Sequence, residues 1–408
     1  MLTKEQNELL TRVEGDAPMG KMLRQYWLPA LRSEALVADG DPVRVRLFGQ
    51  NFVAFRGTDG KAAIFDEGCP HRGASLLLAR NEDCALTCIF HGWKFGNNGK
   101  TVDVPTEPKD RREAFAKKVP LKSYPVKEAG TMVWVWLGEG EVPEFPMLKF
   151  NTMPDTHVRA WVAYVQVNWL QGLEATVDTA HVGVLHKSHI GLLSEGDEFE
   201  DIAPRYDIDP QPYGLRAAAL RRMKDGSEYV RVTEYVAPWY SFIPQPGTHA
   251  VCTISTPIDD YNVGQWYISF DSEQPLSEDK IQFFESMIGP DPNNFYNPKG
   301  TFENRWLQDR ELMKQGHFSG VQGIPIEDFI VEESMGPIAD RTKEFLGSTD
   351  IAIARMRRMF LKSLEDFKNG LPPFALNIKI DYSKIKTNTF YVPKNTDWRD
   401  KFKEIAMK

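Results

Sequence analysis

The spacing of hydrophobic residues changes along the chain and separates regions of different expected structure. Residues 3–26 carry apolar clusters at helical spacing, and Thr3 followed by Gln6 is typical of a helix N-terminus. From about residue 40 to 140 the hydrophobic period becomes two, which predicts many short strands. Within this region Asn98-Gly99 predicts a hairpin turn.

The C-terminal part of the chain mixes both periods. Ile353, Met356 and Phe360 recur at three and four residues, which predicts a long helix that ends near Gly370. We therefore expect an α+β fold whose larger domain has an antiparallel sheet with flanking helices. The expected organisation is an N-terminal helical segment at 1–39, a small all-β domain at 40–145 and an α+β catalytic domain at 146–408. Strands in the last region are expected near 158–168, 229–235, 249–258 and 263–270.

Composition excludes several classes of protein. The 408 residues carry a net charge of −8, so there is no basic excess to neutralise nucleic-acid phosphates. No apolar stretch is long enough to span a bilayer, and the first residues lack the pattern of a signal peptide. We therefore expect an enzyme of the cytoplasm that binds neither nucleic acid nor membrane.

Cysteine and histidine alternate in two short motifs, Cys69-Pro-His71 and Cys88-Ile-Phe-His91. Two thiolates and two imidazoles can hold a zinc ion or a Rieske [2Fe–2S] cluster. In zinc fingers the cysteines pair with each other and the histidines with each other. Here each motif supplies one of each, which favours a dinuclear cluster in which one iron takes both thiolates and the other takes both imidazoles.

A second group of possible ligands lies about ninety residues later. Glu174, Asp178, His181 and His186 fall in one short segment, and two histidines with a carboxylate suit a mononuclear iron with open positions. On an ideal helix the two histidines would point about 140° apart. Both can face one metal only if the helix ends or distorts between them, which Gly183 permits. A polar helical segment with incidental histidines is the alternative.

These motifs resemble those of the Rieske non-haem iron oxygenases. Cys69-Pro-His-Arg-Gly and Cys88-Ile-Phe-His-Gly-Trp resemble the family's paired loops, and Asp178-x2-His181-x4-His186 resembles its iron motif. The opening LTKEQNELLTRV and the later EDFIVEESMGPIADRTKEFLGSTD are similar to the phthalate dioxygenase-like branch. The resemblance implies a [2Fe–2S] cluster and a mononuclear Fe(II). The cluster ligands that it implies are Cys69, His71, Cys88 and His91.

For the mononuclear iron, the resemblance implies that His181 and His186 are ligands and that a late aspartate completes the set. Asp350, at the start of the C-terminal helix, is the expected third ligand, although an acid there also suits the helix dipole. Asp340 and Glu344 are competing carboxylates.

Asp178 is implied to have a different role. The matching aspartate of the family links the ligand His181 to a cluster histidine across a subunit boundary, here His91 of the partner subunit. A carboxylate between two imidazoles fixes their orientation and couples the two metals. Direct ligation of iron by Asp178 is the alternative.

The resemblance implies a terminal oxygenase that uses O₂ to hydroxylate an aromatic acid such as a phthalate or substituted benzoate. The chain shows no dinucleotide-binding fingerprint, so electrons must come from an NAD(P)H-dependent reductase or a ferredoxin. A homotrimer or stacked hexamer is implied. The alternatives are an O-demethylase of methoxylated aromatic acids, a Rieske electron carrier without oxygenase activity and a zinc-stabilised binding protein. Unranked candidates for the substrate pocket are Arg205, Arg216, Arg221, Arg222 and Arg231, with Tyr206, Trp239, Tyr240, Phe242 and Trp266.

Overall fold

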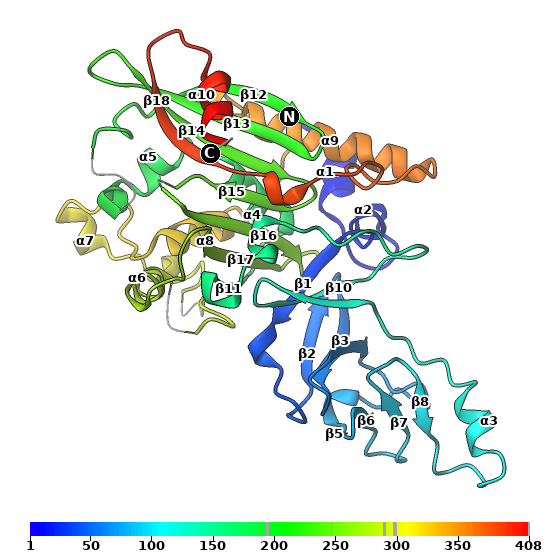
Figure 1. The fold of residues 1–408 in the computed structure, drawn as a ribbon. Helices are drawn as coiled ribbons and strands as arrows, with labels where there is room; N and C mark the ends of the chain where they lie inside the picture. Colours follow the sequence, from blue (N-terminus) through cyan, green and yellow to red (C-terminus); the bar gives the residue numbers. More distant parts are fainter. Residues whose placement is uncertain (193–195, 246, 289–290, 297–299, 407–408) are drawn as a thin grey trace.

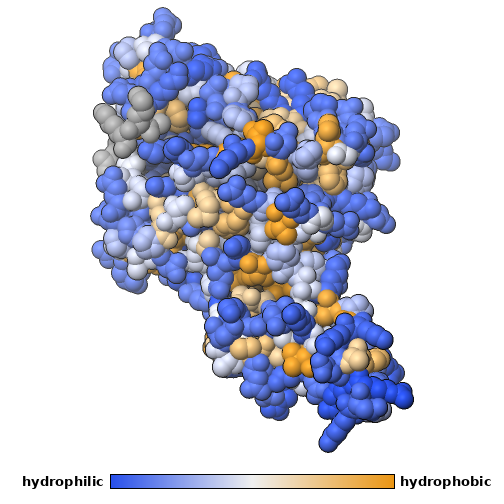
Figure 2. Space-filling view, turned by 45° about the vertical axis from the view of Figure 1, so that its right-hand side comes forward, coloured by the Kyte–Doolittle hydropathy of each residue, from blue (hydrophilic) through white to orange (hydrophobic). Residues whose placement is uncertain are grey.

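The computed structural model describes residues 1–192, 196–245, 247–288, 291–296 and 300–406. It consists of a smaller lobe, blue to cyan in Figure 1, and a larger lobe that contains most of the helices. Figure 2 shows a narrow waist between the lobes and a surface on which hydrophilic residues predominate. Among the described residues, no helix combines the length and apolar character needed to cross a membrane.

The N-terminal segment belongs with the larger lobe. Helix α1 (Lys4–Thr11) begins with the expected capping box, because Thr3 Oγ1 accepts a hydrogen bond from the Gln6 amide and Gln6 Oε1 accepts one from the Thr3 amide. Helices α1 and α2 (Pro18–Leu23) pack against the C-terminal helix α9 (Ile351–Lys368). The predicted helical segment 1–39 departs from expectation at its end, where strand β1 (Trp27–Arg32) enters a sheet.

The smaller lobe is built from short antiparallel strands, as the period of two predicts. Strand β1 pairs with β10 (Met132–Trp136), and β10 pairs with β9 (Val126–Ala129), in a sheet that lies where the lobes join. The predicted Asn98-Gly99 turn joins the last two strands of another sheet, and Gly99 adopts φ +78° there. The remaining elements are β2 (Val43–Leu47), β3 (Gln50–Arg56), β4 (Ala62–Asp66), β5 (Arg80–Glu82), β6 (Ala85–Thr87), β7 (Lys94–Gly96), β8 (Thr101–Asp103) and the short helix α3 (Arg112–Ala116).

The larger lobe is organised around an antiparallel sheet with the strand order β11-β17-β16-β15-β14-β13-β12. Strand β18 (Asn388–Val392) pairs with β14 beyond the short β15. The predicted strands are confirmed, and their residues are almost entirely buried because both faces of the sheet are covered. The strands are β11 (Val158–Val165), β12 (Arg205–Gln211), β13 (Gly214–Arg222), β14 (Glu228–Val236), β15 (Tyr240–Ile243), β16 (His249–Pro257) and β17 (Val263–Asp271).

Helices cover the two faces of this sheet. Helix α4 (Trp169–Val177) and α9 pack on one face, and α8 (Ile324–Ser334) packs against α4. Alternate residues of β13 point to opposite faces, so Ala217 joins the main core and Ala218 packs with α10 (Trp398–Ala406). The long C-terminal helix ends as predicted, with Gly370 at φ +80°. The other helices are α5 (Val182–Leu185), α6 (Glu278–Ile288) and α7 (Arg310–Lys314).

Candidate metal centres and active site

The two cysteine–histidine loops of the smaller lobe have the same backbone structure. The amide of Gly73 donates to the carbonyl of Cys69 at 2.8 Å, and the amide of Gly92 donates to the carbonyl of Cys88 at 2.9 Å. Both glycines adopt φ +76°, which a residue with a side chain rarely tolerates. Each loop therefore turns tightly and presents its cysteine and histidine together.

The side chains of the two loops converge. The Nδ1 atoms of His71 and His91 are 3.1 Å apart, and Cys69 and Cys88 are each 3% exposed. Burial, together with the neighbouring Cys88 thiol, raises the pKa of Cys69 to about 11. Two nitrogens bound to one metal at ~2 Å lie about 3 Å apart, so the two imidazoles fit ligation of a single iron of a cluster. The structure thus brings together all four residues predicted at this site.

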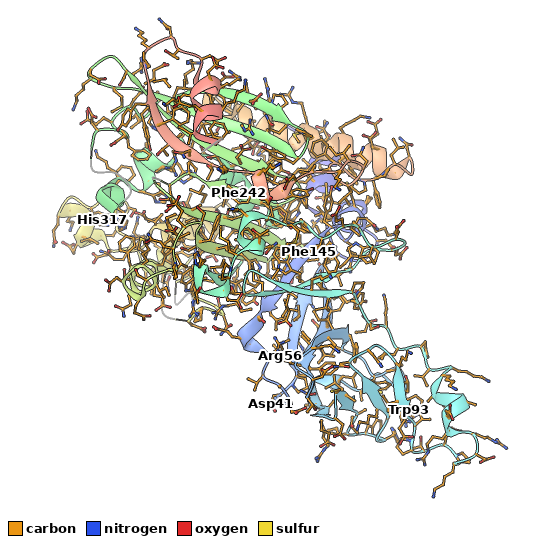
Figure 3. All side chains as sticks on the ribbon, viewed as in Figure 1. Asp41, Arg56, Trp93, Phe145, Phe242 and His317 are labelled. Carbon is orange, nitrogen blue, oxygen red and sulfur yellow. The ribbon has the colours of Figure 1, made fainter. Side chains whose placement is uncertain are left out.

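Aromatic side chains surround this site at the surface of the smaller lobe. The ring of Trp93 stacks on His71 at 4.3 Å, and Phe90 lies 3.9 Å from the ring of His91. Ile89 and Phe90 are more than half exposed. Figure 3 labels Trp93 in the smaller lobe and His317 on the far side of the larger lobe. The cluster site beside Trp93 is therefore remote from His317 of the same chain.

His181 and His186 flank a single helical turn. Helix α4 ends at Val177, and α5 occupies only the residues between the two histidines. Because no continuous helix runs through both, their rings approach each other, with centroids 5.1 Å apart. A break between the two histidines at Gly183 is not seen, because Gly183 lies inside the turn of α5 and the helix instead begins and ends at the histidines themselves.

The carboxylate that meets these histidines is Asp328 of α8. Its Oδ1 lies 3.5 Å from Nε2 of His181 and 3.2 Å from Nε2 of His186. Burial lowers the pKa of His186, but Asp328 and Glu327 outweigh burial and raise that pKa to about 9. Three ligand atoms at these separations fit one metal ion and leave positions open, the pattern of a 2-His-1-carboxylate site.

The prediction of Asp350 as the third member of this group is wrong. Its Oδ2 accepts a hydrogen bond from the Gly347 amide at 2.6 Å, which closes the turn before α9. The residue lines a different cavity, beside Arg205 and Tyr206. The competing carboxylates lie elsewhere, since Asp340 pairs with Lys343 and Glu344 pairs with Arg357.

Asp178 has the hydrogen bonds expected of an orienting group. Its Oδ2 accepts from Nδ1 of His181 at 3.2 Å, and its Oδ1 accepts from the Ala180 amide and the Tyr206 hydroxyl. Burial alone would raise the pKa of Asp178, but the hydrogen bond and charge of His181 lower it. The contact with Nδ1 of His181 agrees with the predicted supporting role of Asp178. The carboxylate that faces Nε2 of His181 is Asp328, not Asp178.

A cavity of about 350 Å³ adjoins His181, His186 and Asp328. Aromatic side chains of α6, including Phe283 and Phe284, form part of its wall. Its polar lining includes Arg231, Gln245, His249 and Lys280. The size and the mainly apolar lining with a few polar groups suit a small organic substrate.

Of the arginines that the sequence left unranked, only Arg231 lines this cavity. Arg221 is buried nearby, Arg216 pairs with Glu234, and Arg205 borders the second cavity with Arg222. The candidate aromatic residues do not line the first cavity, because the strands bury most of them in the core. They are Tyr206, Trp239, Tyr240, Phe242 and Trp266.

Sequence reasoning missed Asp328, although a signal was present. The segment Gly-Ile-Pro-Ile-Glu327-Asp328-Phe-Ile-Val places two acids inside an apolar run. In the structure Glu327 is fully buried and Asp328 is half-buried on α8, which packs against α4, and acids taken out of water in this way require a positive or metal partner. No local spacing relates them to His181 or His186.

Comparison with known families decides the identity of the fold. A Rieske [2Fe-2S] domain model matches residues 26–125, and a model described as "LigXa C-terminal domain like" matches residues 135–407. The chain belongs to the Rieske oxygenases. As a Rieske oxygenase subunit it carries a [2Fe–2S] cluster and a mononuclear iron. The match of the C-terminal domain favours the oxygenase over an electron carrier with no catalytic domain.

Relatives of this Rieske oxygenase cover nearly its whole length. The oxygenase subunit of phthalate 4,5-dioxygenase from Pseudomonas putida is 39% identical, over 98% of this chain and 94% of its own. The oxygenase subunit of 3-chlorobenzoate-3,4-dioxygenase from Comamonas testosteroni is 34% identical, over 99% and 98%. The crystal structure of dicamba monooxygenase shares the fold, with a TM-score of 0.58 at 17% identity, over 86% of this chain and 99% of that one.

Proposed function

We propose that this oxygenase hydroxylates an aromatic carboxylic acid, with O₂ as co-substrate. The observation that carries the proposal is Arg231, a buried cation on the wall of the cavity that adjoins His181, His186 and Asp328. Phthalate and 3-chlorobenzoate, which the names of the relatives include, are acids of this class.

Arg231 is 6% exposed and lies on β14 opposite Ala219 of β13. Arg221, also on β13, is fully buried and donates to the carbonyl of Thr179 at 2.7 Å. In the described part of the chain, neither arginine forms an ion pair with a carboxylate, and Nε of each has no acceptor. Among the described residues, these two neighbouring buried cations therefore have no carboxylate partner.

The energetic cost of this arrangement indicates what the cavity binds. Burial lowers the pKa of both guanidinium groups, and Arg221, which is also repelled by Arg231, falls to about 10. A carboxylate placed beside Arg231 offsets this penalty by a charge-assisted hydrogen bond. Phe283 and Phe284 then supply apolar surface for an aromatic ring.

For the mononuclear iron we propose His181, His186 and Asp328 as ligands, through Nε2 of each histidine. For the cluster we propose Cys69, His71, Cys88 and His91. Iron held by two histidines and one carboxylate supplies O₂ activation, for the insertion of one or two oxygen atoms. The residues of this chain orient the substrate through Arg231 and hold the ring of His181 through Asp178.

The remoteness of the two sites within one chain supports transfer between subunits. Trp93 marks the cluster site in the smaller lobe (Figure 3), and helix α5, which begins after His181, belongs to the larger lobe (Figure 1). We propose a head-to-tail homotrimer, in which Asp178 accepts a hydrogen bond from His91 of the partner subunit. Three further points stay predictions. They are the stacking of trimers into a hexamer, the supply of electrons by an NAD(P)H-dependent reductase or ferredoxin, and a cytoplasmic location.

A substrate panel tests the proposal. Benzoates, phthalates and methoxybenzoates are compared with the corresponding neutral amides, and hydroxylated product is measured against NADH consumed. We expect product from acids and at least tenfold less from the amides, since an amide lacks the charge that pairs with Arg231. Equal turnover of acid and amide would contradict an aromatic acid as the substrate. Formaldehyde release from a methoxybenzoate would select the predicted alternative of O-demethylation.

A further inference from the structure

The ring of His186 lies between two consecutive carboxylates of α8. Asp328 Oδ1 is 3.2 Å from Nε2, and Glu327 Oε2 is 2.7 Å from Nδ1. Glu327 is fully buried, and its other oxygen accepts a hydrogen bond from the hydroxyl of Ser319. Neighbouring residues of one helix thus contact opposite nitrogens of one imidazole.

These contacts determine where the proton of His186 lies. Nε2 faces His181 and Asp328, so it must keep its lone pair free to bind a metal. The proton of the neutral ring is therefore on Nδ1, which donates to Glu327. A carboxylate in this position orients a ligand histidine and increases the basicity of the nitrogen that binds the metal.

Glu327 is itself held in place by the segment before α8. The hydroxyl of Ser319 accepts a hydrogen bond from the Val321 amide at 3.1 Å while it donates to Glu327. Nε2 of His189 lies 3.3 Å from the carbonyl of Val321 and 3.9 Å from Glu327 Oε1. Each oxygen of Glu327 therefore has one defined donor.

His189, His317 and Glu327 also bring ligand atoms within 4.8 Å of one another, but both oxygens of Glu327 and Nδ1 of His317 already accept hydrogen bonds. Nδ1 of His317 accepts from the Gly320 amide at 3.1 Å, so the proton of the neutral ring is on Nε2. A protonated nitrogen is a donor and cannot ligate a metal. Glu327 Oε2 is already engaged by His186.

We propose that Glu327 is a positioning residue for the mononuclear iron. It keeps the proton of His186 on Nδ1 and fixes the orientation of the imidazole ring. It also adds a buried negative charge close to the iron that His186 would bind. This inference rests on the ligand set of the proposed function. Loss of such a supporting partner weakens metal binding by about 10- to 100-fold.

The test measures iron binding by the full-length protein with its cluster in place. Mononuclear iron is removed with a chelator, and Fe(II) is titrated back without oxygen into wild type and Glu327→Gln. Glutamine keeps the size and one acceptor oxygen but removes the charge. We expect Fe(II) affinity to fall about 10- to 100-fold, with the Rieske EPR signal of the reduced cluster unchanged.

Glu333→Gln is the matched control. Glu333 lies on the same helix, and its described hydrogen bonds are with the Gln166 amide, the Tyr296 hydroxyl and the Trp306 ring nitrogen, none of them with a histidine. The same replacement of a carboxylate by an amide there should leave Fe(II) affinity within about twofold of wild type. A similar loss of affinity in Glu333→Gln would overturn the specific role of Glu327.

The remaining outcomes separate this role from a purely structural one. A lower melting temperature of iron-free Glu327→Gln, with Fe(II) affinity within about twofold of wild type, would overturn the proposal. If that variant fails to fold, Ser319→Ala removes only the hydroxyl donor, and unchanged Fe(II) affinity there would overturn it. If Asp328→Asn still binds the iron, the ligand set itself fails. If Asp328→Asn loses the iron and Glu327→Gln does not, only this inference fails.

Discussion

Asp328 Oδ1 lies 3.2 Å from Nε2 of His186, although the two residues come from segments far apart in the sequence. The packing of α8 against α4 produces this contact. It places a carboxylate opposite two histidines beside a cavity lined by aromatic residues. Because Asp328 lies on α8, a substitution in this helix distinguishes a ligand set that contains Asp328 from one that contains Asp350.

Asp328→Asn should remove the mononuclear iron and leave the cluster. We expect turnover to fall more than about 100-fold, since loss of a ligand costs more than loss of a supporting partner. Iron per chain, determined alongside the Rieske EPR signal, measures this. Asp350→Asn is the control and should retain both iron and activity, because Asp350 only closes the turn at Gly347. The reverse pattern would restore Asp350 as the ligand.

Asp178→Asn should keep both metals and slow electron transfer between them. The carboxylate holds Nδ1 of His181 at 3.2 Å, and an amide cannot accept from two imidazoles equally well. We expect at least about a tenfold slower oxidation of the reduced cluster in a single turnover with substrate and O₂. Asp201→Asn, which alters a pair with the exposed Arg222, is the control. A wild-type rate in Asp178→Asn would remove this residue from the transfer path.

Arg231→Gln should weaken substrate binding with little effect on the metals. A hydrogen bond to a charged group contributes about 1.5–3 kcal/mol, which corresponds to roughly 10- to 150-fold in KM. The measurement is KM for the preferred acid, together with iron content. Arg222→Gln changes an exposed arginine outside this cavity and should leave KM unchanged. If KM is unaffected in Arg231→Gln, the carboxylate is bound elsewhere.

Glu174→Ala should destabilise the larger lobe. Glu174 accepts from Arg357 at 2.6 Å and from the fully buried Arg341 at 2.9 Å. Breaking a buried ion pair leaves unpaired charge and costs about 3–5 kcal/mol. Denaturant unfolding, followed by tryptophan fluorescence, measures the shift in midpoint. Glu113→Ala, which removes an exposed pair with Lys117, should leave the midpoint unchanged; equal shifts would show that the buried network contributes nothing specific.

Features encoded within a few residues could be predicted from the sequence. The capping box of Thr3 and Gln6 depends on neighbours three residues apart. The cluster loops depend on glycines that permit positive φ, at Gly73 and Gly92. Each pair of ligands is also local, so the spacing of cysteine and histidine was sufficient to find it.

The sequence by itself determined both metal-binding motifs, the fold class and the two histidines of the mononuclear site. Only the tertiary structure decided that Asp328 rather than Asp350 meets those histidines, and that Arg231 reaches the cavity. The physical reason is that these contacts form between elements distant in the chain. An acid that starts a helix and an acid that binds a metal look alike in sequence, and packing of α8 against α4 distinguishes them.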